Sequence, residues 1–293
     1  MKKPWLAWVH FTSEQGDVRV LGWTQFALCA LMAFDLSILW INDIVPTLYL
    51  TLPAGGIARG TAAPYVLDNL FPTSEAGPAA YVVTTIAYAC AAIGIWPRIT
   101  SLLAITLHAQ LAYLVPEADV AIDRVIRAVL LILLFSDAHQ SRFPGWRGPV
   151  IGNRWPIDLI RLQLVLVYMG PGVAKCINDA GWWSYSDHNP LVTIVGDPIS
   201  GRLDGETALA FAVPLFLLGV GSVLLELSAF LLLTRWRAAW ASFGLLLHVG
   251  IALTMNIGIF SYAMLALYPL IFHGTGVWDR AGRVVRWART KFS

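Results

Sequence analysis

The sequence predicts an all-α polytopic membrane protein, a helix bundle of about eight transmembrane helices with both termini in the cytoplasm. Hydrophobic residues make up 57% of the 293 residues and charged residues only 13%, whereas charged residues average about 25% in soluble domains. The apolar residues recur in spans of membrane-crossing length, and the loops between them alternate in charge. No phosphate-binding loop and no nucleic-acid-binding signature interrupts this pattern, so we expect no nucleic-acid partner.

Seven apolar segments account for the predicted helices. The last segment is too long for one helix of about 20 residues, and Asn256-Ile257-Gly258 is expected to break it into two. The segments cover 21–45, 78–96, 99–116, 121–137, 157–178, 208–234 and 239–272.

The charges between the segments predict the orientation. Basic residues precede the first segment and occupy every second connection and the tail: Lys2, Lys3, Arg19, Arg98, Arg142, Arg147, Arg154, Arg235, Arg237, Arg280, Arg283, Arg286, Arg289 and Lys291. The other connections are acidic or neutral, and the two long ones, 46–77 and 179–207, are expected to fold over the outer face. Both ends are then cytoplasmic, which requires an even number of crossings and favours eight over seven.

The same reading divides the chain into three parts. Residues 1–20 are a cytoplasmic N-terminus, 21–272 the transmembrane domain and 273–293 a basic cytoplasmic tail. The first long apolar run begins near Leu21 without a small-residue cleavage site after it, so we expect no cleavable signal. We expect membrane lipid to be a partner of the transmembrane domain.

The fifth segment holds the most informative residues. Arg161, Tyr168, Gly172 and Lys175 are spaced to lie on one helical face, with the two cations about 21 Å apart at opposite ends. Pro171 is expected to kink the helix just before Lys175. Ionisable groups at membrane depth persist because they pair, line a cavity or react.

Two interpretations of Lys175 stay open on these grounds. A lysine in a protected site can lose its proton and act as a base. Alternatively, its side chain reaches the outer interface, where Trp182 and Trp183 form an aromatic belt.

Other polar residues in apolar sequence need partners. Asp123 and Arg127 have the spacing of a local ion pair, although Asp123 is also a candidate to orient a base. Asp35 and Glu226 are single carboxylates, for which Arg161 and Arg124 are the candidate partners.

Histidine and cysteine do not predict a metal centre. His248 is either a proton carrier or a packed, hydrogen-bonded side chain, and His108 is a weaker version of the same case. The histidines lack metal-ligand spacing such as HxxxH, and Cys29, Cys90 and Cys176 lack CxxC spacing. We therefore expect neither a metal site nor a disulfide framework.

Six blocks in order along the chain carry a family resemblance. They are Leu21-Gly22 with Leu31-Met32-Ala33-Phe34-Asp35, Pro97-Arg98-Ile99-Thr100, Phe135-Ser136-Asp137-Ala138, Arg161-Leu162-Gln163 with Tyr168 and Gly172-Val173-Ala174-Lys175, Glu226-Leu227-Ser228-Ala229, and His248 with Ile257-Gly258-Ile259-Phe260-Ser261-Tyr262-Ala263-Met264-Leu265. In these blocks the chain resembles the HTTM family, the membrane half shared with vitamin K-dependent gamma-glutamyl carboxylase.

The resemblance implies an enzyme and its site. Lys175 matches the family lysine regarded as the base that starts oxidation of vitamin K hydroquinone, with Asp123 and His248 as polar support. The implied cofactor is a reduced quinone, vitamin K hydroquinone or menaquinol, used with O2 and CO2 and without a metal. Residues assigned to cofactor binding from the matching blocks are Tyr168, Gly172, Phe260 and Tyr262.

The chain departs from the carboxylase at several positions. An Asn-His pair is replaced by Ile122-Asp123, a later asparagine by Ile251 and the first lysine of a pair by Ala174. We expect no counterpart of the large extramembrane domain that binds the substrate propeptide. These departures leave open which peptide or small molecule is modified.

Two other function classes stay open. Compact members of the family are also similar to the membrane protein that helps mature a bacterial sporulation-delaying peptide toxin. That likeness implies a maturation factor for a secreted peptide, working with helper proteins and without quinone chemistry. The third class is a non-enzymatic membrane scaffold. In each case the expected location is a bacterial inner (plasma) membrane, and an active site would face outward.

Overall fold

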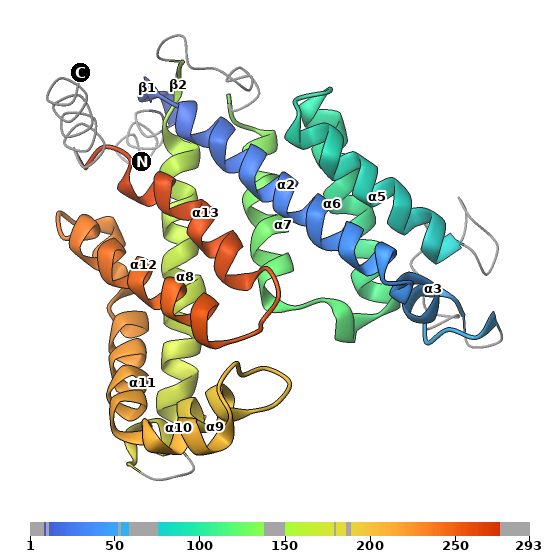
Figure 1. The fold of residues 1–293 in the computed structure, drawn as a ribbon. Coiled ribbons are helices and arrows are strands. Elements are labelled where there is room, and N and C mark those ends of the chain that lie inside the picture. The colour runs from blue at the N-terminus through green and yellow to red at the C-terminus, as the bar shows by residue number, and fades with distance from the viewer. Residues whose placement is uncertain are drawn as a thin grey trace, which may run out of the picture. The chain divides into compact units, whose positions relative to one another are not determined.

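The computed structural model describes residues 9, 12–51, 54–58, 76–137, 150–178, 180–185 and 189–275. Over these ranges the chain is mostly helical, and one small sheet pairs β1 (Gln15–Asp17) with β2 (Ile151–Asn153) in antiparallel register. The chain divides into two compact units, Met1–Pro156 and Ile157–Ser293. Figure 1 shows the elements of each unit.

The described residues of the first unit form five α-helices. A hairpin of two of them packs through its first helix against α2 (Figure 1). The turn of this hairpin needs unusual backbone angles, because Gly94 has a φ of 81° and Trp96 a φ of 42°. The elements are α2 (Arg19–Ile41), α3 (Ile44–Tyr49), the hairpin helices α5 (Ala76–Ala92) and α6 (Pro97–Leu114), the 3-10 turn η2 (Pro116–Ala118) and α7 (Ala121–Leu134).

Polar contacts join the helices of the first unit at buried positions. The Tyr81 hydroxyl donates to the Leu36 carbonyl over 2.8 Å, and the Gln25 amide donates to Ser101 Oγ over 3.1 Å. After α7, the Asp137 carboxylate accepts the backbone N–H of Asn153 over 3.1 Å. A Cβ on Gly152 would lie 2.8 Å from that carboxylate, so glycine permits this contact.

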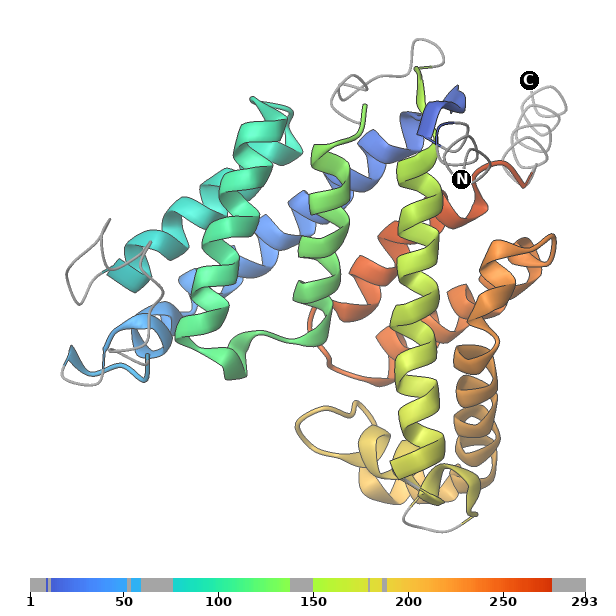
Figure 2. The same cartoon turned by 180° about the vertical axis from the view of Figure 1, so that it is seen from behind.

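The second unit begins with the long helix α8 (Trp155–Asn178), which starts at the boundary. Figures 1 and 2 both show α11 running beside α8. The last two helices of this unit, α12 and α13, pack against each other as a second hairpin. The elements after α8 are η4 (Ala180–Trp183), α9 (Pro190–Gly196), α10 (Gly205–Ala210), α11 (Ala212–Leu227), η5 (Ala229–Leu233), α12 (Arg237–Thr254) and α13 (Phe260–Phe272).

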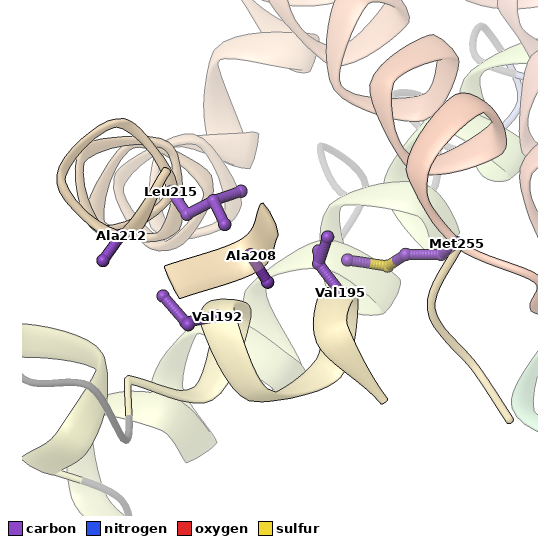
Figure 3. Close-up of a cluster of buried hydrophobic side chains, with 6 residues drawn as sticks. All are labelled: Val192, Val195, Ala208, Ala212, Leu215 and Met255. Carbon is purple, nitrogen blue, oxygen red and sulfur yellow. The ribbon is translucent and has the colours of Figure 1, made fainter. Parts of the chain in front are cut away.

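The segment between η4 and α11 folds onto the end of α12. Its two short helices, α9 and α10, meet α11 and Met255 in a buried apolar cluster (Figure 3). Backbone hydrogen bonds hold the junction: Arg202 N–H donates to the Thr254 carbonyl over 2.9 Å, and Asn256 N–H to the Ser200 carbonyl over 2.7 Å. The described part of the 179–207 connection is therefore packed structure. The cluster consists of Val192, Val195, Ala208, Ala212, Leu215 and Met255.

Each predicted apolar segment contains a helix. The predicted break in 239–272 is confirmed, because α12 ends at Thr254, α13 begins at Phe260 and Gly258 between them has a φ of 59°. Among the described residues, α2, α8 and α12 are long and apolar enough to cross a membrane, and α5, α11 and α13 are shorter apolar helices. Most of the predicted basic tail, 276–293, and residues 59–75 of the first outer loop lie outside the described residues.

A buried arginine closes the C-terminal end of α13. The Arg161 side chain is 3% exposed and donates to the Leu270 carbonyl over 3.1 Å, to the His273 carbonyl over 2.7 Å and to Asp158 over 2.9 Å. Arg237 donates to the same His273 carbonyl over 3.0 Å. The last carbonyls of a helix have no partner inside it, and cations there also oppose the helix dipole. Arg161 thus fastens α13 to α8.

We predict that Arg161→Met destabilises the protein by about 3 kcal/mol, because it removes the largely buried hydrogen bonds of the guanidinium to the Leu270 and His273 carbonyls and to Asp158. Thermal unfolding of the detergent-solubilised protein measures this loss. Arg235→Gln is the matched control, since Arg235 is exposed, and should change stability by less than about 0.5 kcal/mol. Equal losses in both variants would contradict the assigned role of Arg161.

Candidate functional site

A close approach of two helices in the second unit creates the candidate site. A Cβ added to Gly172 of α8 would lie 2.9 Å from the Glu226 Cβ and 3.1 Å from the Leu227 backbone nitrogen of α11. Contacts below about 3 Å are not tolerated by real side chains, so only glycine fits here without a shift. α8 continues through Pro171 to Asn178. The end of α11 is therefore held against the last turns of α8.

This approach places Lys175 in contact with Glu226. The Lys175 ammonium donates to both carboxylate oxygens, over 2.7 Å to Oε1 and 2.9 Å to Oε2. The two side chains are only 22% and 13% exposed. The Lys175 Nζ also lies 4.4 Å from the centre of the Trp182 ring, where the face of an indole attracts a cation. The pair is thus largely withdrawn from water and shielded by an aromatic ring.

A buried hydrogen-bonded network lies on the same unit. The Tyr168 hydroxyl is 2.7 Å from His248 Nε2 and 3.2 Å from the Tyr268 hydroxyl. All three side chains are at least 95% buried, and the Trp240 ring packs edge-on against Tyr168 with centroids 4.9 Å apart. Tyr168 and Lys175 are seven residues apart on α8, about 10 Å along the axis. The network and the ion pair therefore occupy successive levels of one helix.

Gly244 makes room for the network. A Cβ on Gly244 of α12 would clash with the hydroxyl of Tyr268 on α13. His248 follows four residues later on the same helical face, so one face of α12 supplies both the space and the imidazole. Among the described residues, His248 Nδ1 is buried without a hydrogen-bond partner. A buried imidazole with one nitrogen bound and one free can exchange a proton or accept a ligand hydrogen bond.

The residues that sequence reasoning assigned to the site are not all gathered in one place. Lys175 and Gly172 meet Glu226, and Tyr168 meets His248. Phe260 lies beside His248, with ring centroids 5.6 Å apart. Tyr262 is 49% exposed, and no described contact joins it to either group. Trp240, Gly244 and Tyr268 were missed, although the four-residue spacing of Gly244 and His248 is a visible signal.

The structure corrects the ion pairs expected from spacing. Glu226 pairs with Lys175 rather than with an arginine, because Gly172 lets α11 approach α8 at that level. Arg161 pairs with Asp158, and Arg124 with Asp119. Arg127 also binds Asp119, over 2.7 Å, and not Asp123 four residues before it. Helical spacing therefore did not decide these partners.

Asp123 belongs to the first unit, where it caps α7. Its Oδ2 accepts the Val120 backbone N–H over 3.1 Å, which satisfies a free donor at the helix N-terminus. Its side chain is buried near His108 and Asp119. The structure thus describes Asp123 and Lys175 in separate units.

Comparison with known proteins connects this geometry to a family. A family model described as the HTTM domain matches residues 78–275, about two thirds of the chain, and the match includes both parts of the candidate site. No curated protein and no solved structure matches the chain.

We predict that Gly172→Ala destabilises the protein by about 1–3 kcal/mol, because its methyl group would force α8 and α11 apart. Gly170→Ala is the matched control on the same helix, since a Cβ there meets nothing within 4 Å. The control should be neutral or stabilising, by up to about 1 kcal/mol. Thermal unfolding of both variants in detergent tests the difference, and identical behaviour would mean that close packing at Gly172 is unimportant.

Proposed function

Because the chain belongs to the HTTM family, we propose that it is a membrane enzyme of the vitamin K-dependent carboxylase type, with Lys175 as its base. The observation that carries the proposal is the contact of Lys175 with both oxygens of Glu226 in a largely buried position. A base must first be free of its proton, and this pair contains both the proton and an acceptor for it.

Proton transfer within the pair would prepare Lys175 to react. One proton passes from Lys175 Nζ to the Glu226 carboxylate, which converts an ammonium and a carboxylate into an amine and a carboxylic acid. Low polarity penalises the charged form of the pair far more than the neutral form, so burial lowers the cost of this step. The amine can then take a proton from a substrate hydroxyl, while Glu226 keeps the first. In this scheme Glu226 positions Lys175 and accepts its proton.

The residues present fit a reduced quinone. A quinol presents a flat apolar ring and two hydroxyl groups, and this unit offers aromatic rings at Tyr168, Trp240 and Phe260 beside the free Nδ1 of His248. When bound, a quinol supplies an acidic hydroxyl and the electrons that reduce O2, in a reaction that consumes CO2 to modify a carboxylate side chain. Phe260 and Tyr168 would contact its ring, and His248 would hydrogen-bond a hydroxyl.

The proposal includes the membrane topology. Eight helices, α2, α5, α6, α7, α8, α11, α12 and α13, would cross a bacterial inner membrane, with both termini in the cytoplasm. The alternating loop charges support this arrangement. Lys175 follows the long apolar run of α8 and, in this orientation, faces outward. Its substrate would be a peptide or small molecule on that side.

We predict that Lys175→Ala lowers quinol-dependent O2 consumption at least about 100-fold, because the general base is lost. Purified protein in nanodiscs is supplied with menaquinol or vitamin K hydroquinone, and oxidised quinone and O2 are measured together. Glu226→Gln should lower the rate at neutral pH and recover as the pH rises, because Lys175 must then release its proton to water. A merely structural Glu226 would not produce this pH profile.

Glu206→Gln is the matched control, since Glu206 is exposed on α10 and should leave the rate unchanged. Mass spectrometry of the lipid extract of the wild-type protein should also detect a co-purified quinone. Wild-type rates in a folded Lys175→Ala variant would contradict the enzymatic proposal. If cells with Lys175→Ala lose the maturation of a secreted peptide while the wild-type protein turns over no quinone, the maturation-factor class is favoured. If Lys175→Ala changes neither peptide maturation nor quinone turnover, a scaffold is favoured.

A further inference from the structure

Three side chains of the types that bind metal ions converge in the first unit, outside the site described above. His108 comes from α6, Asp119 from the connection after η2 and Asp123 from the first turn of α7. Each offers one ligand atom, and these atoms all lie within 4.8 Å of one another. Ligands around a bound ion with bonds of about 2.0–2.2 Å are about 3–3.5 Å apart. Small side-chain movements would therefore close the cluster around an ion.

The imidazole of His108 makes the kind of hydrogen bond that orients metal-bound histidines. It is 7% exposed, and its Nδ1 lies 3.0 Å from the hydroxyl of Tyr88, which is fully buried on α5. Metal-ligating histidines almost always use their second ring nitrogen in such a hydrogen bond, which fixes the ring and its tautomer. The Tyr88 contact leaves Nε2 available as the ligand atom. Among the described residues, no other hydrogen bond to this imidazole occupies it.

The buried carboxylate of Asp123 is a second feature that favours a bound cation. Asp123 is 6% exposed, and within the described ranges the only hydrogen bond to its carboxylate is from the Val120 backbone N–H to Oδ2. A buried carboxylate beside a second carboxylate is costly unless a cation or a proton lies between them. An ion shared by Asp119, Asp123 and His108 would remove this cost.

Two arginines of α7 already bind the Asp119 carboxylate and would compete with a metal ion for it. Arg124 Nε is 2.8 Å from Asp119 Oδ2, and Arg127 is 2.7 Å from Oδ1. Asp119 therefore already binds two cationic groups, and its carboxylate oxygens are placed to bind a cation. The Arg124 side chain is 67% exposed and can swing into water when an ion takes its place.

We propose that His108, Asp119 and Asp123 bind one divalent transition-metal ion, and this proposal is independent of the quinone chemistry. One imidazole nitrogen and two carboxylate oxygens suit Zn2+, Fe2+ or Mn2+. Three protein ligands leave coordination positions for water. The ion joins α6, α7 and the connection between them. The sequence predicted no metal because the spacings of 11 and four residues match no motif on a single helix.

Direct metal analysis of the full-length protein tests the proposal. Tag-free protein in detergent is stripped with EDTA and dialysed against Zn2+ alone or Mn2+ alone, and the retained metal is counted by mass spectrometry. We expect about one ion per chain and a higher unfolding temperature with the ion. Asp123→Asn and His108→Gln should lower the affinity at least about 100-fold, and Tyr88→Phe about 10–100-fold. Asp204→Asn, an exposed carboxylate in the other unit, should bind as the wild type does.

A second variant keeps the test decisive if the buried substitutions impair folding. Arg124→Gln removes the exposed competing cation and should raise the affinity for Zn2+ about threefold to tenfold. A purely structural cluster of arginines and aspartates would show no such gain. The proposal is wrong if the wild-type protein retains no more metal than folded Asp123→Asn, or if Arg124→Gln leaves Zn2+ binding unchanged or weaker.

Discussion

In a chain this apolar, each charged or polar group inside a helix must find its partner within the protein. Water and loops cannot supply that partner at membrane depth, and an unpaired buried charge is among the most costly features a fold can contain. The Lys175–Glu226 pair is the clearest case, because it combines two charges, two short hydrogen bonds and an aromatic face. The packing of α8 against α11 and the chemistry of the candidate site both depend on it.

The same constraint explains the other polar contacts. Arg161 is buried because the last carbonyls of α13 need donors, and it supplies them from α8. Tyr168, His248 and Tyr268 hydrogen-bond to one another across three helices of the second unit. In the first unit, Asp119 binds two arginines. The contacts of the second unit join different helices, so these polar groups specify which helices pack together as well as being stabilised by that packing.

Small residues allow these contacts to form. Gly172 lets Glu226 reach Lys175, Gly244 leaves space for the Tyr268 hydroxyl, and Gly152 accepts the Asp137 carboxylate at the sheet. Between membrane helices, where lipid is as apolar as leucine, association relies on such close approach and on hydrogen bonds across it. The glycines that matter here are therefore those beside a polar pair. The proposed proton-transfer site and a helix contact are built from the same few residues.

The sequence by itself determined the helical class, the position of each long helix among the described residues and the break at Gly258, because apolar length and helix-breaking residues act locally. It also singled out Lys175, Tyr168 and His248, since polar groups in apolar runs are conspicuous. Only the tertiary structure decided their partners. Glu226 meets Lys175 across 51 positions of chain, and Tyr268 meets Tyr168 across 100. Such contacts depend on which helix faces come together, and helical spacing describes one helix at a time. For that reason the arginine partners expected for Glu226 and Asp123 were wrong, and the cluster of His108 with two aspartates was invisible in the sequence.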